Sequence, residues 1–344
     1  MVHSSPVIVD TARTYLPELW VVLIVLFLLY YAITDGFDLG VGIISLFTRS
    51  PEDRSEMILS LKGIWSGNQT WIVVLGGMLF GAFPIFYSIL LSALYIPMAI
   101  MLFAFIFRGI GIDLGERYQY RAFWRYSFGI GSLAATLSQG FALGGLLSGI
   151  NLKNGSFVGG VWDWLNPFAL LITAGVLFGY TMLGGNFLVW KLEGRLAEKG
   201  RYFALVASVA AGIVSAGTWV WVMLRYPYLS EKLHVWPEQL LLILFPLFAL
   251  ISFGMFLRAI LKQYNLSPLL WNTAIILFSF LGLSLGFWPY MIPSLNEPIT
   301  FRAAAASSPT LVFMFIVMVV LTPVILVYHN YQYWVFRGKT RGRG

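Results

Sequence analysis

Two consecutive stretches set the class of this protein: Leu19-Trp-Val-Val-Leu-Ile-Val-Leu-Phe-Leu-Leu-Tyr-Tyr-Ala32, which is apolar, and Thr34-Asp-Gly-Phe-Asp-Leu-Gly-Val-Gly42, which carries Asp35 and Asp38. An Asp near the middle of a membrane helix costs about 2.5–3.5 kcal/mol on insertion scales, so such acids usually face a protein interior. If the helix continues through the second stretch, the spacing of three places both carboxylates on one helix face. This arrangement suggests proton or cation handling inside a membrane protein. The alternative is a solvated helix end, at which both acids meet water among the lipid headgroups.

The composition indicates an integral membrane protein. Hydrophobic residues make up 59% of the 344 positions and charged residues only 11%, whereas average globular chains have about 25% charged residues. Cysteine is absent, which excludes disulfides, thiolate metal sites and iron–sulfur clusters held by this chain alone. The net charge of +7 is interpreted as a signal of membrane topology rather than of nucleic-acid binding, because the basic residues fall in short loops.

The apolar segments predict an all-α protein with about nine transmembrane helices, since a membrane span needs about 20 mostly apolar residues. No polar tract is long enough for a soluble domain, so residues 1–344 are predicted to form a single polytopic membrane domain. Phe83-Pro84 predicts a tight re-entry between the second and third helices. The predicted helices lie near residues 16–35, 65–83, 85–107, 126–149, 167–190, 203–224, 239–261, 269–293 and 309–333.

The distribution of basic residues predicts the orientation of these helices. Most of the 22 Lys and Arg residues fall in segments that follow odd-numbered predicted helices. Because cytoplasmic loops carry an excess of Lys and Arg, the N-terminus is predicted outside, in the periplasm, and the C-terminus in the cytoplasm.

Polar residues from three predicted helices gather at the predicted cytoplasmic side. One layer is predicted to hold Asp35, Asp38, Trp65, Ser66, Asn68, Gln69, Arg108 and Asp113. Arg108 is the natural charge partner for a buried carboxylate. Carboxyl, amide and hydroxyl groups, together with water, supply donors and acceptors that could carry protons. The alternative is a hydrogen-bond network that only anchors helix ends.

The histidines give no sign of a redox or metal centre in this chain. No two of His3, His234 and His329 have a metal-ligand spacing. His329, near the end of the ninth predicted helix, could in principle be an axial haem ligand. A single His in such a position is more often a hydrogen-bonded residue, which is the interpretation we adopt.

A series of motifs extends over nearly the whole chain. It comprises Thr34–Gly42, Trp65-Ser-Gly-Asn-Gln-Thr-Trp71, Gly76-Gly77 through Ala82-Phe-Pro84, Phe107-Arg108 with Asp113, Phe287-Trp-Pro-Tyr-Met-Ile-Pro293, Ala306-Ser-Ser308, and Leu321-Thr-Pro323 through Tyr328. In order and spacing these motifs resemble subunit II of cytochrome bd-type terminal quinol oxidases. The motifs Ser92-Ala-Leu-Tyr95, Phe107-Arg-Gly109 and Gln139-Gly140 are most similar to the cyanide-insensitive branch.

The resemblance implies a role in a complex that oxidises quinol and reduces dioxygen to water in the bacterial inner membrane. It places haem b, haem d and their ligands in subunit I, and gives this chain no catalytic residue, cofactor site or metal of its own. It implies packing against subunit I and a cytoplasmic proton path, so that proton motive force arises without pumping. Membrane lipids, a structural quinone or lipid and a small single-helix accessory subunit are further expected partners. The proton-path residues implied are Asp35, Asp38, Ser66, Gln69 and Asp113, supported by Trp65, Asn68 and Arg108.

Ser66 departs from the family pattern, in which the position after Trp65 is usually an acid. A serine can hold a water but cannot store a proton at ordinary pH. Protons would therefore pass through water ordered by Ser66 and Gln69, or use another entrance.

Two other functions remain open on the sequence. A secondary transporter would bind a cation or small solute in the polar cluster, although no clearly interrupted helix pair of the kind that marks such a site is evident. A purely structural subunit would use the polar layer only to hold helices together.

Overall fold

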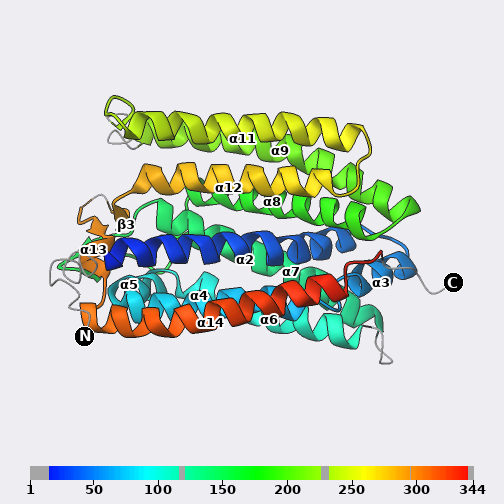
Figure 1. Ribbon diagram of the computed structural model, residues 1–344, viewed down its shortest axis with the longest axis horizontal. Helices are drawn as coiled ribbons and strands as arrows, with labels where there is room; N and C mark the ends of the chain where they lie inside the picture. The colour runs from blue at the N-terminus through cyan, green and yellow to red at the C-terminus, as the bar shows by residue number, and fades with distance from the viewer. Residues whose placement is uncertain (1–14, 116–120, 226–231, 295, 340–344) are drawn as a thin grey trace, which may run out of the picture.

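The computed structural model describes residues 15–115, 121–225, 232–294 and 296–339, which are mostly helical. The long helices run side by side (Figure 1). The first of them begins at one end of the bundle and the last finishes at the opposite end, as an odd number of crossings requires.

Eight helices in the described part of the chain are long and apolar enough to cross a membrane. They are α2 (Leu16–Leu46), α6 (Tyr95–Leu114), α7 (Arg121–Leu147), α8 (Pro167–Lys191), α9 (Gly194–Arg225), α11 (Glu238–Leu261), α12 (Ser267–Phe287) and α14 (Ser308–Val335). A ninth span is formed if α4 (Trp65–Ala82) and α5 (Pro84–Ala93) are counted together, with a bend of 118° between them. The predicted fold class is therefore confirmed.

The remaining described elements are short and lie at the ends of the bundle (Figure 1). They are the helices α3 (Pro51–Leu59) and α13 (Phe301–Ala304), and two antiparallel hairpins. The first hairpin pairs β1 (Leu152–Lys153) with β2 (Ser156–Phe157), and the second pairs β3 (Tyr290–Ile292) with β4 (Ile299–Thr300).

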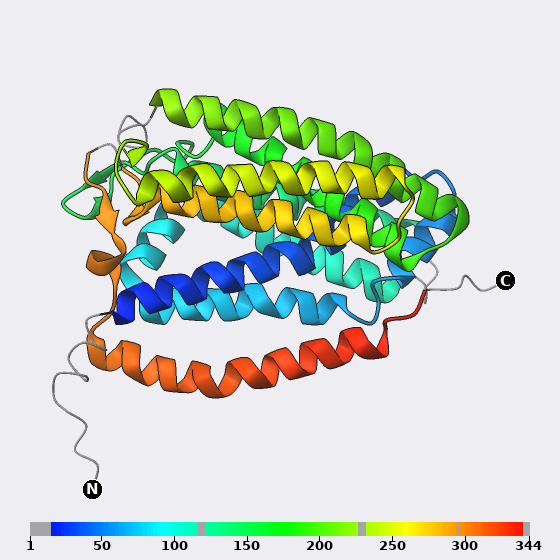
Figure 2. The same ribbon diagram turned by 45° about the horizontal axis from the view of Figure 1, so that its top comes forward.

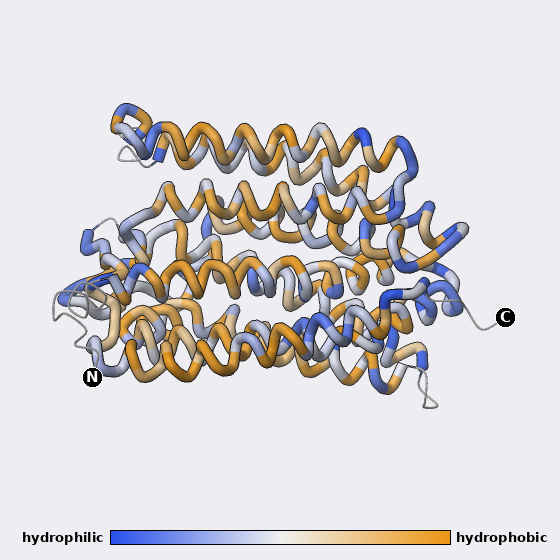
Figure 3. The backbone as a smooth tube through the Cα atoms, viewed as in Figure 1, coloured by the Kyte–Doolittle hydropathy of each residue, from blue (hydrophilic) through white to orange (hydrophobic). Residues whose placement is uncertain are grey.

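The surface of the bundle has the apolar belt of a membrane protein. Hydrophobic residues cover the middle of the helices, and hydrophilic residues gather at the two ends (Figure 3). Large apolar side chains point outward, such as Leu224 on α9, which is 81% exposed, and Leu250 on α11. Such surfaces are stable against lipid tails rather than water.

The central helix α2 packs against α4, α7 and α8, while α9 and α11 lie on one side of the bundle and α14 on the other (Figures 1 and 2). The backbones of α2 and α8 approach each other closely. A Cβ added at Gly40 would lie 1.8 Å from the carbonyl oxygen of Tyr180, and one added at Gly184 would lie 2.3 Å from the carbonyl carbon of Gly40. The absence of side chains at these two positions lets the helix backbones touch.

Several predicted helix boundaries were wrong, among them the start of the helix predicted at 203–224, which begins at Gly194, and the end of the one predicted at 85–107, which continues to Leu114. The first helix does not stop at residue 35 but continues to Leu46. The third predicted helix, 85–107, is divided at Leu94, because the ring of Pro97 excludes the carbonyl of residue 93, four positions earlier. The predicted helix 269–293 ends at Phe287, since a residue before proline, here Trp288, disfavours helical backbone. The predicted break at Phe83-Pro84 is present.

We predict that Gly40→Ala destabilises the protein, because its methyl group would push α2 away from α8. Overpacking of this kind costs about 1–3 kcal/mol, which lowers the thermal unfolding temperature of the purified protein. Gly179→Ala on α8 is the matched control, since a Cβ there meets nothing within 4 Å. Equal melting temperatures for the two variants would show that the α2–α8 contact does not require Gly40.

Candidate functional site

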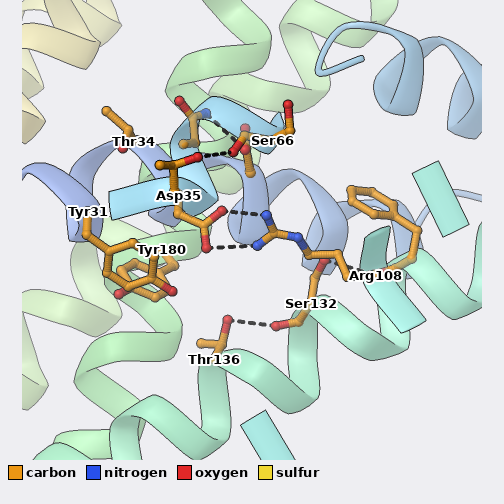
Figure 4. Close-up of polar contacts among 12 residues, drawn as sticks. Tyr31, Thr34, Asp35, Ser66, Arg108, Ser132, Thr136 and Tyr180 are labelled. Carbon is orange, nitrogen blue, oxygen red and sulfur yellow. Dashed lines mark hydrogen bonds and ion pairs between the residues drawn. The ribbon is translucent and has the colours of Figure 1, made fainter. Parts of the chain in front are cut away.

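A buried ion pair joins α2 to α6 at the centre of the site. Arg108 Nη1 donates to Asp35 Oδ2 at 2.9 Å, and Arg108 Nη2 donates to Asp35 Oδ1 at 2.5 Å. Both side chains are 0% exposed, and the two parallel contacts are visible in Figure 4. A bidentate, charge-assisted pair of this kind is strong and fixes the relative position of both groups.

The second acid, Asp38, has a different set of partners. Asn68 Nδ2 on α4 donates to Asp38 Oδ2 at 2.9 Å, and Tyr333 on α14 donates its hydroxyl to Asn68 Oδ1 at 2.8 Å. Asp38 is also 0% exposed. Its Oδ1 atom is buried and has no hydrogen-bond partner among the described residues.

The charges in this buried cluster do not balance if both acids are ionised. Arg108 supplies one positive charge, and Asp35 takes both of its terminal nitrogens. Asp38 is left with one neutral amide donor. An uncompensated charge in a buried site is costly unless it is neutralised or paired, so the arrangement favours a proton on Asp38.

Two tyrosines lie beside Asp35 (Figure 4) and are joined through a glutamine of α7. Gln139 Nε2 donates to the Tyr31 hydroxyl at 2.8 Å, and the Tyr180 hydroxyl donates to Gln139 Oε1 at 2.9 Å. These residues were not predicted to belong to the site, and neither was Tyr333. A glutamine within an apolar span is a signal that could have found Gln139, whereas nothing in the sequence pairs Tyr333 with Asn68.

The structure brings together only half of the predicted polar layer. Asp35, Asp38, Asn68 and Arg108 form the buried cluster. Trp65 is half-buried and lies beside Gly109 of α6, since a Cβ added at Gly109 would be 3.2 Å from the Trp65 ring. The other predicted residues lie outside the cluster: Ser66 and Asp113 are exposed, and Gln69 is half-buried.

The alternative of a solvated helix end is wrong. Because α2 continues to Leu46, Asp38 lies roughly 12 Å before the end of the helix, at 1.5 Å per residue. Both acids are fully buried, so they do not meet water among the headgroups at a helix terminus.

His329 does not fit the role of an axial haem ligand. His3 lies outside the described residues and His234 is exposed, whereas His329 is 1% exposed. Trp71 Nε1 donates to His329 Nδ1 at 3.3 Å. Indole can only donate, so Nδ1 accepts and the proton of the neutral ring sits on Nε2, where iron would have to bind. No group of three or more metal-ligating residues occurs in the described part of the chain.

The fold and the site define a polytopic α-helical membrane protein with an ion-paired acid cluster inside its helix bundle. The family model described as "Cytochrome bd terminal oxidase subunit II" matches residues 16–336. The chain therefore belongs to the cytochrome bd terminal oxidase subunit II family.

Curated relatives and a solved structure agree with this assignment. The chain is 29% identical to "Cytochrome bd-I ubiquinol oxidase subunit 2" of Escherichia coli strain K12, with 93% of this chain and 94% of the relative covered. It is 26% identical to "Probable cytochrome oxidase subunit 2" of Haemophilus influenzae, with 93% of each covered. A chain of the bd oxidase structure from Geobacillus thermodenitrificans has the same fold, with a TM-score of 0.75, 15% identity, and coverage of 93% of this chain and 99% of that one.

The protein is thus a multi-pass subunit of a bacterial inner-membrane oxidoreductase complex. As subunit II of a terminal oxidase it has a subunit I as its partner, and the family implies haems in the complex.

We predict that Asp35→Asn prevents stable assembly, because it leaves the Arg108 charge buried and unpaired. Breaking a buried pair in this way costs about 3–5 kcal/mol, so the yield of purified complex and its melting temperature should fall. The double variant Asp35→Asn with Arg108→Gln should recover much of the loss.

Glu18→Gln is the control for this prediction, because Glu18 pairs with Arg302 at a partly exposed position. Exposed ion pairs are worth about 0–1 kcal/mol. If Asp35→Asn were no more harmful than Glu18→Gln, the buried pair would not be needed for stability.

Proposed function

We propose that this chain supports assembly with the haem-bearing subunit I and delivers cytoplasmic protons for the reduction of dioxygen to water. The complex would oxidise quinol through haem b and haem d held by subunit I. Protons taken from the cytoplasm, and quinol protons released outside, would generate proton motive force without a pump. Family membership favours this role over a secondary transporter.

The observation that carries the proton role is the unequal pairing of two neighbouring buried acids. Asp35 is held by both terminal nitrogens of Arg108, so it positions the arginine. Asp38 has a free Oδ1 atom among the described residues. Asp38 is therefore the acid that takes up and releases a proton, and the exchange occurs at Oδ1.

Asn68 and Tyr333 position the proton-carrying acid. Asn68 holds Asp38 Oδ2, and the Tyr333 hydroxyl fixes the orientation of the Asn68 amide by occupying its oxygen. A side-chain amide does not gain or lose charge by protonation at ordinary pH. These residues therefore orient Asp38 and leave proton transfer to water at its other oxygen.

The predicted outer residues would act at the mouth of this path. Ser66 is exposed and Gln69 half-buried on α4, where both could order water in place of the acid that Ser66 replaces. Asp113 is exposed near the end of α6, so we assign it to proton collection at the mouth of the path. Trp65 would cover the path from the side.

The wider organisation follows from the same proposal. Residues 1–344 would form one membrane domain with the N-terminus in the periplasm and the C-terminus in the cytoplasm. Further partners would be membrane lipids, a structural quinone or lipid, and a small single-helix accessory subunit.

Asp38→Asn should slow quinol-driven oxygen consumption by roughly 10²-fold, the lower range for the loss of a positioned proton-transfer group. The substitution keeps the side-chain shape but removes the exchangeable proton. The measurement is oxygen consumption per haem in the purified complex. Ser45→Ala is the control, because Ser45 is equally buried on α2 but its hydroxyl donates to the Gly42 carbonyl rather than to the acid cluster. Wild-type turnover of Asp38→Asn at full haem content would refute the assignment.

Asp113→Asn should lower turnover less than Asp38→Asn, and mainly towards high pH, because proton collection becomes limiting when protons are scarce. Oxygen consumption should be followed between about pH 6 and pH 8, the range around neutrality in which histidines and perturbed acids titrate. A turnover equal to wild type across this range would remove Asp113 from the path.

A further inference from the structure

Two buried asparagines outside the acid cluster have polar atoms that the described chain does not satisfy. Asn186 on α8 is 0% exposed and Asn272 on α12 is 1% exposed. Both polar atoms of the Asn186 side chain, Nδ2 and Oδ1, and the Nδ2 atom of Asn272 are buried without a hydrogen-bond partner among the described residues. Most buried polar side-chain atoms in proteins are paired, so these three atoms call for a partner that is not a protein group.

The two asparagines lie at the same depth in the bundle. Asn186 is five residues before the end of α8 at Lys191, and Asn272 is five residues after the start of α12 at Ser267. Each is therefore about 7.5 Å from its helix end, at 1.5 Å per residue. Because α8 ends and α12 begins at the same end of the bundle (Figure 1), both amides lie at one level.

The apolar residues around them show that α8 and α12 meet at this level. Met182 of α8 belongs to a small buried cluster against which Trp271 and Ile275 of α12 pack. Asn186 follows Met182 by four residues, so both lie on one face of α8. Asn272 lies between Trp271 and Ile275 in the chain, and both helices therefore bring an amide to the same junction.

Asn272 is on the inward face of its helix. Leu269 and Ile276, three residues before it and four residues after it, share this face. Both pack in the main hydrophobic core. The Asn272 amide therefore points towards the interior of the bundle rather than towards its outer surface.

The unpaired atoms define the chemistry of a bound molecule. No hydrogen bond joins the two amides directly, because Asn186 Oδ1 and Asn272 Nδ2 both lack a partner. A molecule between them must donate to Asn186 Oδ1 and accept from Asn272 Nδ2. A metal cation could not accept from the amide nitrogen, and a hydrocarbon chain could satisfy neither atom. Water can do both, it is small enough for a fully buried site, and buried waters in proteins typically make about three such bonds.

We propose that Asn186 and Asn272 bind internal water. One water accepts from Asn272 Nδ2 and donates to Asn186 Oδ1, and a second accepts from Asn186 Nδ2. Hydrogen bonds through water, in addition to apolar packing, then join α8 to α12 at this level.

The water site is separate from the acid cluster. Asn186 and Tyr180, the residue of α8 that lies beside Asp35 (Figure 4), are six residues apart. At 3.6 residues per turn this separation is roughly 120° around the helix. The inference therefore does not depend on the proton role.

The first test is X-ray radiolytic footprinting of the purified complex with subunit I, in which irradiated water forms hydroxyl radicals that oxidise the side chains beside it. Met182 should be oxidised in the wild type although it is only 3% exposed. This oxidation should be lost in the double variant Asn186→Leu, Asn272→Leu, which removes every polar atom of the site. Met78 on α4, 2% exposed, is the reference and should stay unoxidised in both proteins.

The second test is the melting temperature of the complex. Asn186→Leu and Asn272→Leu should each lower it, because each leaves the other amide with a poorer set of partners. The double variant should lose less than the sum of the two, since replacing both polar partners by apolar groups is the less costly change. Thr181→Val is the matched control on α8, because the Thr181 hydroxyl already donates to the Leu177 carbonyl of its own helix.

A density map of the wild-type complex that resolves ordered water decides the matter if the Leu variants fail to assemble. It should show water within hydrogen-bond distance of both amides. The proposal is overturned if the map shows the two amides bonded to each other, a molecule other than water, or no water between them. Equal oxidation of Met182 in the wild type and the double variant would overturn it as well.

Discussion

The contact between Asp35 and Arg108 constrains the rest of the site. Both side chains are fully buried, and removing either would leave a lone charge where water cannot reach it. Because Arg108 is committed to Asp35 through two hydrogen bonds, it cannot also neutralise Asp38. The second acid, held by the Asn68 amide, is therefore the one to which the proposed function assigns a change of charge.

The same region shows how packing outweighs local backbone preference. Glycine costs about 1 kcal/mol relative to alanine inside a helix, yet α2 runs without a break through Gly36, Gly40 and Gly42. A Cβ at Gly40 would overlap the backbone of α8, and one at Gly42 would overlap Ser132 of α7. The glycines bring neighbouring helices close enough to enclose the acids, which explains why this helix extends well beyond its predicted end.

A small pocket lined by Gly67, Thr70 and His329 lies on a different face of α4 from Asn68, which reaches the acid cluster. The same helix therefore separates a buried polar interior from the outer surface of the described chain. On α14, Tyr333 donates to Asn68 of the acid cluster, and His329, one helical turn earlier, lines the pocket. α14 thus contributes to both, although it packs at the edge of the bundle (Figure 2).

The sequence by itself determined the class of the protein, the approximate number of spans and the family, because apolar length and motif order are local properties that survive in a linear chain. It also selected Arg108 as the partner of a buried acid. Only the tertiary structure decided which acid that was, because the distance between α2 and α6 is not encoded in spacing along the chain. The structure also separated Ser66 and Asp113 from the cluster, since a residue's helix face is settled by the neighbours that pack against it. The bond from Tyr333 to Asn68 joins positions far apart in the sequence, so folding alone could reveal it.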